Sequence, residues 1–154
     1  MIAVDTNILV YAHRRESPSF AAASAALSEL AAGSAVWAIP TPCLAEFCAV
    51  VTNPRAFRTP TTFLQLQSQI EAWSQSPSFA WLHSTLRHWS QLRSLAESGT
   101  VVGGQFHDAR IAAVCLENGV RELWSADRDF GRFPALRVRN PLVAGGGARV
   151  AKRG

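Results

Sequence analysis

The segment Met1-Ile2-Ala3-Val4-Asp5-Thr6-Asn7-Ile8-Leu9 decides the fold of this 154-residue chain. Its short apolar beginning predicts a buried strand over residues 2–4, and Thr6 begins a pattern that predicts a helix to about His13. Asp5 stands between the two. Its carboxylate is therefore expected at the carboxyl end of the first strand, where open α/β sheets bind their ligands. The alternative is that Asp5 only caps the helix that follows it.

The rest of the chain continues this alternation of short strands and helices. Further strands are predicted over residues 35–39, 79–82, 121–125 and 137–139, with helices over 17–33, from 41 onward, over 62–75 and 85–97, and from about 107 to 118. Short apolar strands that alternate with helices indicate a parallel sheet with helices on both faces. We therefore expect a single compact α/β domain with α/β/α layers over residues 1–141, followed by a flexible basic tail over 142–154.

Composition and charge limit the class of protein. Hydrophobic residues make up 48% of the chain, and no apolar run reaches the roughly 18 residues of a membrane helix. No basic region precedes the first apolar run, so we expect a cytoplasmic protein rather than one with a signal peptide. The net charge is +4 and fourteen of the fifteen basic residues are arginine. This charge is suited to a polyanionic partner, although a GC-rich genome is the simpler explanation of the arginine excess.

Acidic residues occur at the ends of apolar runs, where an unpaired charge is unfavourable. Asp127 and Asp129 directly follow the fourth predicted strand, as Asp5 follows the first, with ordinary turn formation as the alternative. Glu46 is the only charged residue within residues 42–52, a helix that we expect to be apolar on nearly all sides. An ionised glutamate in such a helix requires a partner, a metal ion or a cleft.

Asp108 is expected near the same place, although an acid in the first turn of a helix also simply complements the helix dipole. Positions 108, 111, 112 and 115 share one helical face, and the last three are Ile, Ala and Cys, so the carboxylate points toward the core. A cluster of these acids stays ionised only around a cation. Oxygen ligands without Cys or His select Mg²⁺ or Mn²⁺ rather than zinc, and such ions support phosphoryl chemistry.

Four motifs in this order resemble those of the PIN-domain ribonucleases, and especially the VapC toxins of toxin–antitoxin pairs. They are Val4-Asp5-Thr6-Asn7-Ile8-Leu9, the helix of Glu46, Phe106-His107-Asp108-Ala109, and Ser125-Ala126-Asp127-Arg128-Asp129-Phe130. The resemblance extends from Met1 to about Pro141. It implies a compact α/β/α fold, a Mg²⁺- or Mn²⁺-dependent endoribonuclease, and a homodimer that is inhibited by a VapB-like antitoxin.

The resemblance also assigns roles to individual residues. Four acids match the metal-binding and catalytic positions of the family: Asp5, Glu46, Asp108 and Asp127. Asp129 is an additional candidate ligand. Ser125 stands where the family has Ser or Thr, a hydroxyl group next to the metal ligands. Asn7 is expected to orient Asp5 or a water molecule.

Binding of RNA requires positive charge and stacking surfaces in addition to the acids. The candidates lie after the first helix and in the turn-rich loop 53–60: Arg14, Arg15, Arg55, Phe57 and Arg58. The alternative for this loop is a solvated segment with one anchoring aromatic ring. The tryptophan-bearing stretch 73–89 matches no motif, and we expect its rings in the core, in a dimer interface or in a groove for an antitoxin helix.

Three other functions remain open at this stage. A housekeeping PIN nuclease of RNA maturation would have the same acids and no antitoxin. A phosphatase or phospho-acceptor domain would use Asp5 as nucleophile but usually has a lysine near the phosphate, and the only lysine here is Lys152. A non-catalytic binding module would keep its partner after amides replace the acids.

Overall fold

A computed structural model of the protein describes residues 1–143. These residues contain one sheet of five parallel strands in the order β3-β2-β1-β4-β5. The strands are β1 (Ile2–Val4), β2 (Trp37–Pro40), β3 (Phe79–Leu82), β4 (Glu122–Trp124) and β5 (Arg137–Arg139). Each overlaps a predicted strand, so the expected parallel sheet is confirmed. Of the expected tail over 142–154, residues 144–154 lie outside the described part of the chain.

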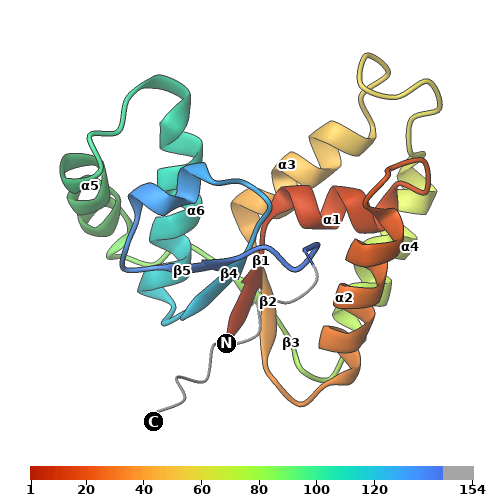
Figure 1. Cartoon of the computed structure of the whole chain (residues 1–154), viewed down its shortest axis with the longest axis horizontal. Helices are drawn as coiled ribbons and strands as arrows, with labels where there is room; N and C mark the ends of the chain where they lie inside the picture. Colours follow the sequence, from red (N-terminus) through yellow and green to blue (C-terminus); the bar gives the residue numbers. More distant parts are fainter. Residues whose placement is uncertain (144–154) are drawn as a thin grey trace, which may run out of the picture.

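Helices cover both faces of the sheet (Figure 1). They are α1 (Thr6–His13), α2 (Phe20–Ala32), α3 (Thr41–Val51), α4 (Phe63–Ser74), α5 (His88–Ser98) and α6 (Phe106–Glu117). The chain moves outward from β1 to β3 through α1–α4 and then returns through α5 and α6 to β4, on the other side of β1. Crossovers between parallel strands are right-handed as a rule, so crossovers that run in opposite directions along the sheet lie on opposite faces. Helices α1–α4 and helices α5 and α6 therefore cover different faces, and the expected α/β/α layers are confirmed.

The reversal of direction lies between β1 and β4, which pair with each other along their whole length. The segments that leave these two strands turn to opposite faces, so a crevice remains between them at the carboxyl edge of the sheet. Asp5 follows β1 and the segment 125–129 follows β4. The topology therefore brings residues separated by about 120 positions to one place.

Local signals explain where several helices begin and end. Asp5 has extended backbone angles and its carboxylate accepts a hydrogen bond from the Thr6 N–H, so it does cap α1. Thr62 and Gln65 form a reciprocal capping box at the start of α4. At the end of α6, Gly119 adopts a φ of +72°, a left-handed conformation that glycine accepts without steric cost.

Two details of the sequence prediction were wrong. The second helix begins at Phe20 rather than near residue 17, because the Ser17 hydroxyl accepts a hydrogen bond from the Ser19 N–H and stabilises a turn there. The helix of Glu46 is buried on one face only. Pro42, Cys43, Phe47 and Val51 are buried, whereas Glu46 and its neighbours Ala45 and Ala49 are exposed. This exposed side of α3 includes one wall of the candidate site described below.

The core lies between the sheet and the two helix layers. Its largest fully buried side chains are Trp37, Phe47, Phe130 and Phe133. Trp73 is buried and packs against Phe47 with 5.1 Å between ring centroids, as expected for a core residue. In contrast, Trp89 on α5 is 68% exposed. None of the helices in residues 1–143 combines the length and apolar character needed to cross a membrane.

Candidate active site

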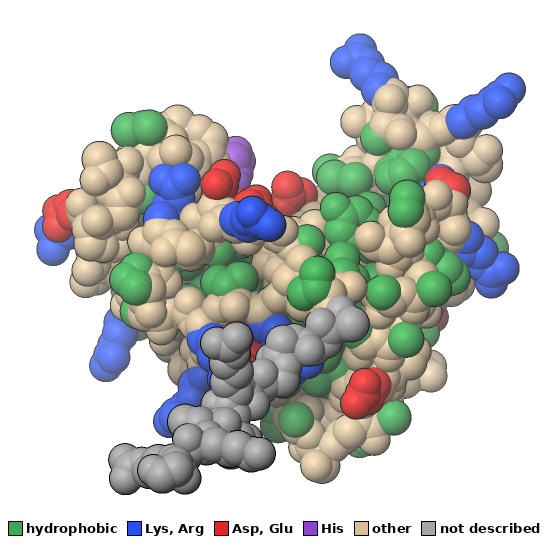
Figure 2. All heavy atoms as spheres, viewed as in Figure 1, with side chains coloured by type: hydrophobic (Ala, Val, Ile, Leu, Met, Phe, Trp, Pro, Cys, Tyr) green, Lys and Arg blue, Asp and Glu red, His purple; other side chains and the backbone are tan. Residues whose placement is uncertain are grey.

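The crevice between β1 and β4 opens into a cleft of about 330 Å³. Figure 2 shows acidic side chains gathered in the hollow between the side of the molecule that carries α5 and α6 and the side that carries α1 and α3. The cleft combines acids with apolar side chains from both groups of helices. Its lining consists of Asp5, Thr6, Asn7, Val10, Tyr11, Glu46, Val50, Asp108, Ile111 and Asp127. All four acids expected at the site therefore line one cleft.

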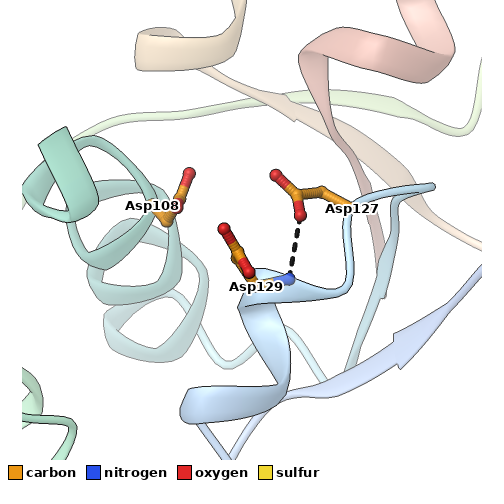
Figure 3. A group of neighbouring side chains, drawn as sticks. All are labelled: Asp108, Asp127 and Asp129. Atoms are coloured by element: carbon orange, nitrogen blue, oxygen red, sulfur yellow. Dashed lines mark hydrogen bonds between the residues drawn. The ribbon is translucent and has the colours of Figure 1, made fainter.

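Three aspartates form the tightest group in this region. One carboxylate oxygen from each of Asp108, Asp127 and Asp129 lies within 4.8 Å of the other two. Asp108 extends from the first turn of α6, and the other two belong to the segment after β4 (Figure 3). The Asp129 backbone N–H donates a 2.8 Å hydrogen bond to the Asp127 carboxylate, which fixes the geometry of this turn. Asp129, only an additional candidate from the sequence, is thus an integral member of the group.

Asp5 lies deeper, at the base of the cleft, and is only 4% exposed. One of its oxygens accepts a hydrogen bond from the Thr6 N–H at 2.7 Å, and the other accepts from Asn7 and Ser125, each at 2.6 Å. Burial nevertheless dominates over these stabilising bonds. Together with repulsion from Glu46, it raises the pKa of the Asp5 carboxyl from its ordinary 3.8 to about 6.

Asn7 and Ser125 join the two strands at the reversal point. The Asn7 amide donates to the Ser125 hydroxyl at 3.0 Å, and its carbonyl oxygen accepts from the Ala126 N–H at 3.1 Å. The Ser125 hydroxyl also accepts a 3.0 Å bond from the Asp127 N–H. This network connects Asp5 to the loop that carries Asp127. Both side chains therefore orient acids of the cleft.

Glu46 reaches the cleft from the opposite wall. Its carboxylate accepts a 2.7 Å hydrogen bond from the hydroxyl of Thr6, a residue that the sequence analysis did not select. Tyr11 was missed as well, although it lies one helical turn after Asn7 and therefore on the same face of α1. A helical projection of α1 from Asn7 would have identified it.

The chemistry of the donor set fits a hard divalent cation. Burial, followed by repulsion from Asp127 and Asp129, raises the pKa of the Asp108 carboxyl, which is the effect expected for acids gathered without a counter-ion. The Cys43 sulfur lies 3.7 Å from an Asp5 oxygen. Burial raises the pKa of this thiol well above its ordinary range, so it stays protonated and is a poor metal ligand. Carboxylate oxygens remain as the ligands, a set typical of Mg²⁺ or Mn²⁺.

The five expected RNA-binding residues lie away from the acids, around a second hollow at the ends of α1 and α3. Arg14, Arg15, Phe57 and Arg58 line it, and Arg55 is exposed in the same loop. The Arg14 side chain, however, is occupied within the protein by Glu16, Thr59 and Thr61.

Comparison with known protein families agrees with this architecture. The sequence profile of the PIN domain matches residues 2–136. The chain belongs to the PIN-domain family. Among curated PIN-domain relatives, ribonuclease VapC43 of Mycobacterium tuberculosis is 39% identical over 142 residues, which cover 92% of this chain and 96% of VapC43. Ribonuclease VapC31 of the same organism is 29% identical over 143 residues, covering 92% of this chain and 100% of VapC31.

Solved structures share the PIN-domain fold. VapBC2 from Rickettsia felis, bound to a DNA fragment from its promoter, superposes with a TM-score of 0.63 at 23% identity and covers 91% of this chain and 98% of its own. VapC20 of Mycobacterium tuberculosis, a toxin that cleaves the sarcin-ricin loop, has a TM-score of 0.62 at 18% identity and covers 85% and 93%. At these identities the likeness concerns the fold.

Proposed function

We propose that this PIN domain is a Mg²⁺- or Mn²⁺-dependent endoribonuclease, a toxin that hydrolyses RNA phosphodiester bonds in the cytoplasm until an antitoxin binds it. The observation that carries the proposal is the cleft at the strand reversal, where Asp5 lies next to the group of Asp108, Asp127 and Asp129. The relation to VapC ribonucleases over nearly the whole chain supports RNA as the substrate.

The residues of the cleft divide into three roles. Asp5, Asp108, Asp127 and Asp129 hold the cation, and Glu46 adds a further carboxylate from the opposite wall. Asn7 and Ser125 keep Asp5 in position through their hydrogen bonds, and Thr6 does the same for Glu46. When bound, Mg²⁺ or Mn²⁺ lowers the pKa of a coordinated water and stabilises charge on the phosphate oxygens. The acids also repel an RNA phosphate that enters the cleft without the cation, which weakens binding at the acids themselves but not at positively charged surfaces outside the cleft.

Partners follow from the relatives. The solved neighbours include VapBC and other toxin–antitoxin complexes, and a VapB-like antitoxin is therefore the proposed inhibitor of this chain. Large exposed hydrophobic side chains offer surface for this antitoxin and for a second copy of the chain. They include Phe63 and Leu64 at the start of α4 and Leu86 and Trp89 near the start of α5.

The test is cleavage of RNA by the purified protein in the absence of antitoxin. We expect discrete fragments from total cellular RNA with Mg²⁺ or Mn²⁺, and none after chelation. Asp108→Asn and Asp127→Asn should remove the activity and leave the fold intact, as judged by circular dichroism. Glu71→Gln, which removes an exposed acid of α4, is the matched control and should cleave normally. Intact RNA with the unmodified protein, or equal cleavage by the Asp127→Asn variant, would refute the proposal.

A further inference from the structure

Two hollows follow one another along α1 and α3. The acidic cleft is lined by Val10 and Tyr11 of α1 and by Val50 of α3. Residues further along the same two segments line a larger open groove of about 860 Å³: His13, Arg14, Arg15, Ala56, Phe57 and Arg58. In Figure 1 both α1 and α3 lead away from the centre of the molecule toward the loops that border this groove. The groove therefore lies beyond the cleft in the direction in which both helices run.

The groove carries positive charge that is not neutralised. Arg15 and Arg58 are exposed, and within residues 1–143 neither of them pairs with an acid. Figure 2 shows basic side chains projecting from this end of the molecule. Glu16 is the only acid in the described lining, and it is bound to Arg14. Exposed guanidinium groups without a carboxylate partner are suited to phosphates.

Arg14 differs from Arg15 and Arg58 because its guanidinium group is buried in the protein. It donates to the Thr61 hydroxyl at 3.0 Å and to the Thr59 carbonyl at 2.8 Å. It also lies over the Phe57 ring, with 4.0 Å from Cζ to the ring centroid. These contacts fix the loop 53–60 and hold the half-buried Phe57 ring in the wall of the groove. Arg14 is therefore a positioning residue, and direct contact with a ligand falls to Arg15 and Arg58.

Tyr11 lines the cleft in the last turn of α1, on the side toward the groove. Its half-exposed ring lines the cleft with Val10 and Val50, so that the cleft offers an apolar surface next to its acids. A phosphate gains no favourable contact from an apolar surface, whereas a nucleobase stacks on an aromatic ring. Arg14 of the groove follows Tyr11 by three positions, the spacing of neighbours on one side of a helix.

From this arrangement we propose that a single-stranded stretch of the substrate runs from the acidic cleft past Tyr11 into the arginine groove. The proposal rests on the proposed ribonuclease function and adds the path of the strand. The eight residues of α1 span about 12 Å. A stacked strand advances about 3.4 Å per nucleotide, so the path holds about three or four nucleotides on one side of the scissile phosphate, and fewer if the strand is extended.

Binding of single-stranded RNA without metal tests the path independently of cleavage. The probe is a set of labelled oligouridylates of about 3 to about 12 nucleotides, with affinity measured by fluorescence anisotropy in EDTA over a range of salt. Each phosphate contact on a single strand contributes about 0.7 to the slope of log K against log salt. We expect the double variant Arg15→Ala, Arg58→Ala to lower this slope by about 1.4 for the longer probes only. The matched control is Arg87→Ala, Arg121→Ala, which removes two exposed arginines outside the cleft and the groove.

Variants at Tyr11 test the stacking step. Loss of one base–aromatic contact lowers affinity about tenfold or more, so Tyr11→Ala should bind the probes about tenfold more weakly while Tyr11→Phe binds normally. In cleavage assays the same Tyr11→Ala variant should raise KM more than it lowers kcat, because it removes binding rather than the metal site. Equal effects of the Phe and Ala variants would overturn the assignment of a stacking role.

The two proposals can fail separately. If the unmodified protein cleaves RNA but the Arg15, Arg58 variant has an unchanged slope, or one no lower than the control, the path is refuted and the nuclease stands. In that case the groove is available to a protein partner instead. If RNA binds with the expected length and salt dependence but is never cut with Mg²⁺ or Mn²⁺, the path stands and the nuclease is refuted.

Discussion

Asp5 makes the stability of the metal-free protein depend on pH. Burial raises the pKa of its carboxyl from 3.8, the value in an exposed chain, to about 6 in the folded protein. Between these values the folded state binds a proton that the unfolded state releases. Stability increases with pH only where the unfolded state binds more protons, so here the free energy of unfolding falls as the pH rises from 3.8 to about 6.

The size of this effect follows from the shift. The interval between 3.8 and about 6 corresponds to about 3 kcal/mol at about 1.36 kcal/mol per pH unit. Asp5→Asn removes the titration and keeps the size of the side chain. Its amide places a donor where an oxygen accepts from Asn7 and Ser125, which costs about 1–3 kcal/mol at every pH. The variant is therefore less stable than the unmodified protein below about pH 4 and regains about 3 kcal/mol relative to it by about pH 7.

Urea unfolding in EDTA, followed by tryptophan fluorescence, measures this difference directly. Unmodified protein and the Asp5→Asn variant are compared from about pH 4 to about pH 7, with Glu71→Gln as a control for the loss of one exposed carboxylate. We expect the gap between the first two proteins to change by about 2.5 kcal/mol across this range, since the first part of the change occurs below about pH 4. A gap that stays constant with pH would show that Asp5 is not a buried, destabilised acid and would refute the reasoning.

Three further predictions concern single residues. Asp129→Asn removes one of the three clustered carboxylates. It should lower kcat/KM about 10- to 100-fold and raise the Mg²⁺ concentration needed for half-maximal cleavage. An unchanged Mg²⁺ requirement in initial-rate titrations would place Asp129 outside the metal site. Arg14→Ala should destabilise the protein by about 2–4 kcal/mol in urea unfolding, through lost hydrogen bonds and the contact with Phe57, and a loss below about 0.5 kcal/mol would contradict its positioning role. Gly119→Ala should lower the free energy of unfolding by about 1–2 kcal/mol because residue 119 has a φ of +72°. Gly131→Ala should change it little, since a Cβ at Gly131 also meets no atom within 4 Å and its φ is not positive. Equal shifts of the melting temperature would disprove the conformational cause.

Much of this protein could be predicted from its sequence because its local signals are strong. Apolar runs of three or four residues mark β1, β2 and β3, and β1 and β3 have the bounds that the pattern predicted. Four aspartates after strands or in a first turn, together with Glu46 in an otherwise apolar helix, indicated an oxygen-ligand site; four of these acids line one cleft and the fifth, Asp129, joins its tightest group.

Tertiary structure alone decided which of these groups meet, and how. Strand order places β1 next to β4, so that Ser125 contacts both Asp5 and Asn7 across about 120 positions, a pairing that no local pattern encodes. The side chain of Arg14 turns inward because Thr61, from a distant loop, accepts its hydrogen bond, whereas its neighbour Arg15 stays exposed. Composition and spacing determine which side chains are available, but burial, partners and pKa depend on contacts between segments far apart in the chain. For this reason the sequence could name the acids of the site, and only the fold separates the buried Asp5 from the half-buried Asp108 and the exposed Asp127 and Asp129.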